Sequence, residues 1–274
     1  MTLRKKFTWL CFVLLAFVFT MPARSADPAS RRVLRISADP NNLPFTNERL
    51  EGFENKIAAI IAKELDCELQ YIWRAQRRGF FRIALKEGEC DLVLGAPVGF
   101  DRALVTKPYY RSSYVFVARK DRSIGIQSFD NPKLRTLKIG VQMVGSDGFN
   151  TPPVHALNHR GLVNQLVGFT VYGNYAEENP PARIVEAVAK SEVDVAVVWG
   201  PLAGYFAKSQ AVPLELTPVK PTNDPPGLTF AFDIGLGVRK GNRELRDQLN
   251  EILKRKQPEI DRILDDYGVP RAKE

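Results

Sequence analysis

The chain of 274 residues is poor in cysteine and histidine, with three of the first and two of the second. These side chains most often bind transition metals or assist nucleophiles. His155 and His159 are four residues apart on a predicted helix, but no glutamate follows His155 as a zinc-protease motif requires. The sequence also lacks a nucleophile elbow, a phosphate loop and a dinucleotide fingerprint. We therefore predict no metal site, no cofactor and no enzymatic activity.

Long hydrophobic runs are also scarce, and the run over residues 9–20 is too short to span a bilayer. It follows three basic residues and precedes Ala23 and Ser25, whose small side chains suit a signal-peptidase cleavage site. Because Cys11 lies inside the run and no cysteine directly follows it, lipid attachment is not indicated. We predict that residues 1–25 are a cleavable signal peptide and that the mature protein resides in the periplasm without spanning the membrane.

Half of the basic excess of the chain belongs to this leader. The leader holds four of the 39 basic residues and none of the 31 acidic ones, so the net charge is about +4 without it rather than +8. Basic and acidic residues are interspersed, and no basic stripe of the kind that binds nucleic acid is present. We predict no nucleic-acid partner.

Two cysteines remain after cleavage, Cys67 and Cys90. An oxidising compartment permits a disulfide between them, but each precedes a different predicted strand, and spacing alone does not show that they come within bridging distance. The pair is either a disulfide or two buried thiols.

Hydrophobic periodicity predicts a first β-α-β-α-β unit with parallel strands. Its strands cover residues 33–37, 69–73 and 91–95. Its first helix begins at Phe53 and has an apolar face at positions i, i+3, i+4 and i+8. Its second helix covers residues 79–86.

A second unit of the same architecture follows a stretch of turns. Strands are predicted at 137–141, 166–172 and 193–198, the last closed by Trp199, Gly200 and Pro201. Helices are predicted at 151–159, behind the N-cap signal Thr-Pro-Pro, and at 181–190.

The rest of the chain predicts two crossings between the units. Residues 115–118 and 230–238 have strand character, residues 211–227 are proline-rich and predicted irregular, and two helices end the chain. The fold class is therefore α/β, with two lobes, a two-strand hinge and a cleft between them. We assign residues 33–118 and 229–274 to lobe 1, and residues 119–228 to lobe 2.

The stretch from Asp91 to Lys120 predicts a ligand site at the end of a sheet. In open α/β sheets, ligands bind outside the carboxyl ends of the strands, where Gly95, Ala96, Tyr109 and Tyr110 fall. The alternative is a packed surface turn with a buried tyrosine pair.

Several segments, in chain order, resemble a periplasmic solute-binding protein of family 3, the amino-acid-binding type with the type II periplasmic binding fold. They are LRISADPNNLPF, GFENKIAAIIAKEL, CDLVLGAP, TKPYYRSSYVFVARK, LKIGVQ, VDVAVVWGPLAGYFA and IGLGVRKGNREL. The resemblance covers nearly all of the mature chain and implies the same two-lobed fold.

Within that family the chain most resembles the branch associated with quinoprotein (PQQ-dependent) methanol and alcohol dehydrogenases. The segments that indicate this are DPNNLPF, QRRGF, PYYRS, NTPP, YGNYAEENPPAR and WGPLAGYF. The resemblance implies an accessory partner of such a dehydrogenase, and of its cytochrome c, with a role in maturation or activation. The alternative is the substrate-binding protein of an ABC transporter, which takes a small organic solute to a permease.

Two positions depart from the amino-acid binders that the chain resembles. Those proteins hold the ligand carboxylate with an arginine, and the candidate here, Arg102, is closer to the Pro-Tyr-Tyr segment than their pattern expects. They hold the ligand ammonium with an acidic residue where this chain has Trp199, which offers a ring face but no negative charge. An ordinary amino acid is therefore not the expected ligand.

The candidate cleft residues come from both units. The chain supplies a basic turn, a glycine-containing turn and several aromatic residues, each of which is alternatively a solvated or packed structural feature. We also interpret Glu54 as a helix-start charge and Asp39 as a turn residue. The predicted ligand or partner cleft comprises Asp39, Asn42, Phe45, Gln76, Arg77, Arg78, Gly95, Ala96, Tyr109, Tyr110, Arg111, Gly145, Ser146, Asp147 and Trp199.

Overall fold

The computed structural model describes residues 32–77, 79–86, 88–144, 150–170 and 175–273. The predicted signal peptide lies outside these ranges. The strands are β1 (Arg32–Ala38), β2 (Asn41–Asn42), β3 (Thr46–Asn47), β4 (Cys67–Trp73), β5 (Leu92–Pro97), β6 (Leu104–Val105), β7 (Tyr110–Arg119), β8 (Ile139–Met143), β9 (Leu166–Thr170), β10 (Val195–Trp199), β11 (Leu214–Pro218), β12 (Asn223–Asp224), β13 (Leu228–Thr229) and β14 (Ala231–Val238).

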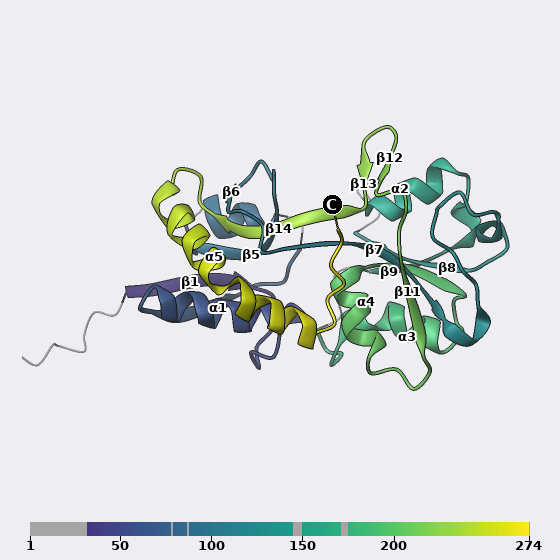
Figure 1. The fold of residues 1–274 in the computed structure, drawn as a ribbon, viewed down its shortest axis with the longest axis horizontal. Coiled ribbons are helices and arrows are strands. Elements are labelled where there is room, and N and C mark those ends of the chain that lie inside the picture. Colours follow the sequence, from purple (N-terminus) through teal and green to yellow (C-terminus); the bar gives the residue numbers. More distant parts are fainter. Residues whose placement is uncertain (1–31, 78, 87, 145–149, 171–174, 274) are drawn as a thin grey trace, which may run out of the picture. The chain divides into compact units, whose positions relative to one another are not determined.

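One sheet joins most of the described strands, in the order β4-β1-β5-β14-β7-β10-β8-β9 (Figure 1). We call β4, β1, β5, β14 and β6 the first half of the sheet, and β10, β8, β9 and β11 the second half. Pairing is parallel between β1 and its neighbours β4 and β5, and between β8 and its neighbours β10 and β9. The predicted α/β class, with parallel strands in each part, is confirmed.

The long strand β7 connects the two halves. Tyr110 to Ser113 pair antiparallel with β14 of the first half, whereas Tyr114 to Arg119 pair with β10 and β11 of the second. Successive side chains of β7 point to opposite faces, so Val115 and Val117 join one core and Phe116 joins another. This strand therefore contributes to both hydrophobic cores of the second half, and Tyr110 at its start belongs to the core of the first.

Two helices cover one face of the first half, α1 (Phe53–Glu64) and α5 (Arg243–Asp266), and they lie side by side (Figure 1). Their inward residues, including Ile57, Ile61 and Leu249, are buried against β1 and β5 in one core. The apolar period predicted for α1 is confirmed. A helical turn, η1 (Arg82–Lys86), lies where the second helix of this unit was predicted.

The second half carries α2 (Pro152–His159), α3 (Arg183–Ala189) and α4 (Gly200–Ala207). Short helical turns complete the described part of the chain: η2 (Lys120–Arg122), η3 (Pro132–Arg135), η4 (Val163–Gln165) and η5 (Pro180–Ala182). None of the described helices is both long enough and apolar enough to cross a membrane.

Three element predictions were wrong. Helix α4 begins directly after β10, where only a closing turn was predicted, because Pro201 fits the first turn of a helix. Strand β11 forms inside the segment predicted to be irregular, with Pro218 at its end. The two predicted C-terminal helices are one, since Pro258 lies on the exposed side of α5 and its lost backbone bond faces solvent.

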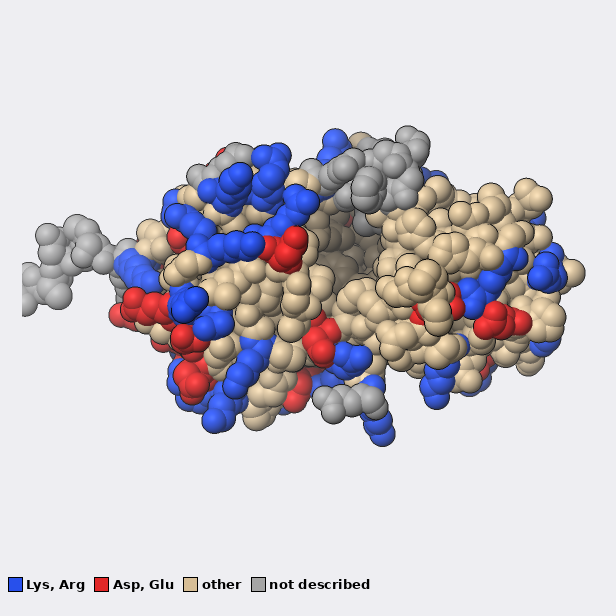
Figure 2. All heavy atoms as spheres, turned by 90° about the horizontal axis from the view of Figure 1, so that it is seen from above, with Lys and Arg blue, Asp and Glu red and all other residues tan. Residues whose placement is uncertain are grey.

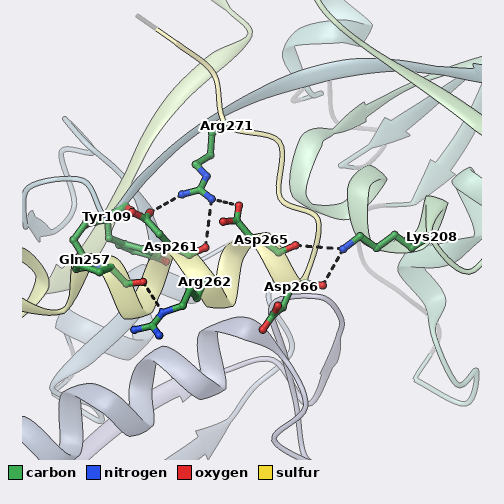
Figure 3. A network of polar contacts seen from close by, with 9 residues as sticks. Tyr109, Lys208, Gln257, Asp261, Arg262, Asp265, Asp266 and Arg271 are labelled. Carbon is green, nitrogen blue, oxygen red and sulfur yellow. Dashed lines mark hydrogen bonds and ion pairs between the residues drawn. The ribbon is translucent and has the colours of Figure 1, made fainter.

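The C-terminal residues after α5 run from the first half to the second. Tyr267 stacks on Tyr205 of α4 with ring centroids 5.5 Å apart, and the Ser112 hydroxyl donates a 2.6 Å hydrogen bond to the Pro270 carbonyl. Figure 3 shows Lys208, which follows α4, donating to the carbonyls of Asp265 and Asp266 at 3.3 and 2.9 Å. The C-terminal end of α5 is thereby tied to α4.

Cys67 and Cys90 are both free thiols, so the alternative of a disulfide is not realised between the cysteines that the structure describes. The Cys90 thiol is buried and donates to the Ala84 carbonyl at 3.2 Å, and burial raises its pKa to about 11. These are two structural thiols, one in the core and one partly exposed.

Candidate functional site

A cavity of about 1020 Å³ lies where the two halves of the sheet meet. The first half contributes Phe45, Gln76 and Phe81 to its lining, and the second half contributes Gln142 and Leu202. It opens as the hollow visible in Figure 2. Its place at the strand ends is the one that open α/β sheets generally use for ligands.

The first half supplies a basic rim to this cavity. Arg77, Arg82 and Arg102 all line it and are exposed, and Figure 2 shows Lys and Arg side chains gathered on this half beside the hollow. The second half contributes no charged side chain among the described lining residues, which are Gln142, Val144, Thr151, Tyr175, Pro181, Trp199 and Leu202. The mouth is therefore positive on one side and neutral on the other.

Aromatic side chains from the central strands line the cavity. The Trp199 ring lies 5.4 Å from Tyr114 and 5.9 Å from Phe232, centroid to centroid, in edge-to-face arrangements. Tyr110 is buried beside them and also lines the cavity. The indole thus packs against its neighbours and still faces the open space, where it is able to stack on a ligand.

Asp39 is a buried carboxylate with hydrogen bonds from both sides of the cleft. It accepts from the backbone N–H of Asn41 at 2.9 Å, from the N–H of Gln76 at 2.6 Å, and from the Tyr175 hydroxyl at 2.6 Å. Burial and the Asp39 carboxylate raise the pKa of Tyr175. Close by, Asn41 Nδ2 donates to the Glu177 carbonyl at 2.8 Å. Asp39 is more than a turn residue, because it joins segments that lie far apart in the chain.

Glu54, in the first turn of α1, is a second buried carboxyl that lines the cavity. It is 6% exposed, and its Oε1 lies 3.5 Å from the Tyr109 hydroxyl. Burial raises the pKa of Glu54 to about 8, and the Tyr109 hydrogen bond opposes this only partly. Glu54 therefore does lie at the start of a helix, as the sequence indicated, but it is buried and belongs to the cavity as well.

The structure brings eight of the predicted site residues to the cavity. They are Asp39, Asn42, Phe45, Gln76, Arg77, Gly95, Tyr110 and Trp199. Four more predicted site residues, Arg78, Gly145, Ser146 and Asp147, lie outside the described residues.

Three predicted site residues do not line the cavity. Ala96 is fully buried on the opposite face of β5 from Gly95, because side chains alternate along a strand. Tyr109 lies in the core beneath the cavity, and only its hydroxyl reaches toward it, at Glu54. Arg111 pairs with Asp233 at 2.7 Å, away from the cavity.

Sequence reasoning missed Glu54 and Tyr175 as residues of the site. A signal for Glu54 was present, since it precedes Ala58 and Ile61 by four and seven residues, the spacing of the buried stripe. Tyr175 lies in a segment without strong periodicity, and only the fold places it against Asp39. No group of three or more His, Cys, Asp or Glu residues with metal-binding geometry occurs among the described residues.

Comparison with protein families gives one match over almost the whole described chain. Residues 34–270 match the family model of bacterial extracellular solute-binding proteins, family 3. A curated relative, Protein MoxJ of Methylorubrum extorquens (strain AM1), is 30% identical over 262 residues, which are 92% of this chain and 85% of the relative.

Two solved structures are similar across 88% of this chain and all of their own. MxaJ from Methlophaga aminisulfidivorans MPT is 26% identical with a TM-score of 0.76. The periplasmic binding protein XoxJ from Methylobacterium extorquens AM1 is 34% identical with a TM-score of 0.71. These similarities confirm both the type II periplasmic binding fold and the branch that the sequence resembles.

Proposed function

The chain belongs to family 3 of the bacterial extracellular solute-binding proteins, and from this premise we propose that it is a periplasmic, non-enzymatic accessory protein of a quinoprotein methanol or alcohol dehydrogenase. The observation that carries the proposal is the similarity to MoxJ and to the periplasmic binding protein XoxJ over most of the chain. It agrees with the segments that resemble the dehydrogenase-associated branch. Its role would be in maturation or activation of the enzyme.

The cleft and its basic rim are the proposed contact surface. Arg77 and Arg102 are exposed at the mouth, and no Lys or Arg of the second half lines the cavity among its described residues. Exposed cations at one edge attract an acidic surface and raise the association rate more than the final affinity. Arg111 is a weaker candidate than its sequence position indicated, because Asp233 neutralises it.

Native mass spectrometry of the tagged protein, gently isolated from its own periplasm, tests the proposal. We expect a complex that contains the dehydrogenase. If purified protein binds neither the complete dehydrogenase nor its cofactor-free form, the proposal is wrong.

The surface is tested with charge reversal. The double variant Arg77→Glu/Arg102→Glu is expected to associate more slowly at low salt and to lose most of its salt dependence. The matched control is Arg135→Glu/Lys254→Glu, which reverses two exposed charges that do not line the cavity. Equal rates for the two double variants would contradict the assigned surface.

The second candidate function is an uptake receptor that delivers a small organic solute to an ABC permease. The size of the cavity and its aromatic lining favour this alternative, while Trp199 at the position of the usual acidic residue disfavours an ordinary amino acid. A rise in melting temperature with a transported solute, without any dehydrogenase complex, would support it.

A further inference from the structure

The cavity contains a carboxyl group without a positive partner. Glu54 lines the cavity and is 6% exposed, and none of the ion pairs of the described residues includes it. Its hydrogen bond with the Tyr109 hydroxyl is long, 3.5 Å from oxygen to oxygen. A buried carboxyl in this situation lacks the stabilisation that a counter-charge or short hydrogen bonds give.

Gly95 leaves this carboxyl open. A Cβ atom at Gly95 would lie only 2.8 Å from Glu54 Oε1, and the backbone φ of +71° is one that other residues adopt with strain. Both residues line the cavity. Any side chain at position 95 would crowd the carboxyl, so the glycine preserves the space in front of it.

Several aromatic side chains line the cavity that holds this carboxyl. Phe45, Tyr110, Trp199 and Phe232 line the same cavity as Glu54. The face of an aromatic ring carries negative partial charge and attracts cations, most strongly where water is excluded. A cavity that combines a buried carboxyl with several rings is a chemical environment that suits an ammonium group.

The titratable neighbours of Glu54 bring no positive charge. Tyr109, which precedes β7, Tyr110 of β7 and Tyr71 of β4 face it, and burial raises the pKa of each of the three, so all are neutral at physiological pH. Lys56 of the same helix lies instead over the ring of Tyr267, 4.8 Å from its centroid. The missing charge would have to come from a ligand.

We infer that this part of the cleft binds an organic cation, an ammonium group on a small apolar body, with Glu54 as its counter-charge and the surrounding rings as its walls. The site is independent of the dehydrogenase proposal, because it involves a small molecule and the isolated protein. The arginines lie at the mouth, where solvent and salt screen their repulsion of the ligand.

The test compares choline, a permanent cation, with its neutral isostere 3,3-dimethylbutan-1-ol by isothermal titration calorimetry on the purified protein. We expect choline to bind about tenfold more tightly or better, since charge is the main difference between the two probes. Glu54→Gln, which keeps the shape of the side chain, is expected to abolish the preference. Glu48→Gln is the matched control, because Glu48 is exposed and does not line the cavity.

A pH series on the unaltered protein gives a second reading that needs no variant. Burial holds the pKa of Glu54 at about 8, and choline requires the ionised carboxyl. Choline affinity should therefore rise by up to about tenfold per pH unit as the pH approaches 8, and then level off.

Three results would overturn the inference. They are equal binding of choline and its isostere, unaltered choline binding by a folded Glu54→Gln variant, and the absence of binding by both choline and benzylammonium at millimolar concentration. If Glu54→Gln fails to fold, the comparison of choline with its isostere on the unaltered protein decides, and equal binding of the two contradicts the site. None of these outcomes bears on the dehydrogenase complex.

Discussion

The Tyr175 hydroxyl donates a 2.6 Å hydrogen bond to Asp39 Oδ2, across the mouth of the cleft. Asp39 follows β1 of the first half, whereas Tyr175 lies between β9 and α3 of the second. The same carboxylate is held by two backbone N–H groups of its own half, from Asn41 and Gln76. Tyr175 therefore bonds to a carboxylate that the backbone of its own half already holds in place.

Tyr175→Phe is expected to weaken closure of the cleft. A hydrogen bond to a carboxylate contributes roughly 1.5 to 3 kcal/mol, and Tyr175 is only half-buried, so a loss near the lower end is expected. Small-angle X-ray scattering should show a larger radius of gyration for the variant. Tyr71→Phe serves as the control, because the Tyr71 hydroxyl donates at 3.4 Å to Asn55 within the first half. A radius that is the same in all three proteins would show that this bond does not hold the cleft.

Glu54 should make the protein less stable as the pH rises from about 4.5 to about 8. The folded protein holds a proton on Glu54 in this window, because burial raises its pKa to about 8 from 4.5, whereas the unfolded chain has released it. The free energy of unfolding should fall by up to about 1.4 kcal/mol per pH unit from this group and be flat above pH 8.

Urea unfolding of the wild type and of Glu54→Gln across this pH range isolates the effect, since other groups titrate equally in both proteins. The difference in unfolding free energy should grow with pH in favour of the variant. A difference that does not change with pH would mean that Glu54 is ionised in the folded state.

The sequence predicts the architecture of this protein well because its strands and helices carry strong periods. Ile57, Ile61 and Leu65 mark α1 without ambiguity, and the short apolar runs of β5 and β10 are typical of buried parallel strands. The misses arise where local signals conflict. Pro258 ends a helix by local rules, yet the burial of Leu253 and Ile260 on α1 maintains α5 through it.

The site is only partly predictable, because it depends on which segments meet. The alternation along β5 predicts that Gly95 and Ala96 lie on opposite faces of the sheet. Only the folded structure shows that the face of Gly95 is the one that lines the cavity. The bond between Tyr175 and Asp39 joins an aperiodic segment to a turn, and neither residue type nor spacing predicts it. Glu54 differs, since its position in the apolar period of α1 indicated burial.

Cys90 is expected to resist thiol reagents while the protein is folded. It is fully buried, and burial raises its pKa to about 11, so almost no reactive thiolate is present at neutral pH. Cys67 is partly exposed and should react first. Peptide mass spectrometry after alkylation, with and without denaturant, checks this order. Recovery of a disulfide-linked peptide of the two cysteines would contradict the structure.

Gly204→Ala is expected to displace the C-terminal tail. A Cβ atom at Gly204 would lie 1.9 Å from the carbonyl oxygen of Gly268, a clash with backbone that no rotamer change relieves. Overpacking of this kind typically costs about 1 to 3 kcal/mol, although alanine favours the helix that contains it. Hydrogen exchange should show faster opening of the Ala272 N–H, which donates to the Arg111 carbonyl at 3.1 Å.

Lys208→Gln is the comparison variant for Gly204→Ala. It tests the side-chain hydrogen bonds between α4 and the end of α5 separately from the backbone contact of Gly204 with Gly268. It removes the exposed cation that bonds the Asp265 and Asp266 carbonyls at the end of α5 (Figure 3). Its effect should be smaller, roughly 0.3 to 1 kcal/mol, and should diminish in high salt. If Gly204→Ala were as mild as Lys208→Gln, the tail would be able to shift without loss, and the close approach of α4 to Gly268 would not secure the two halves.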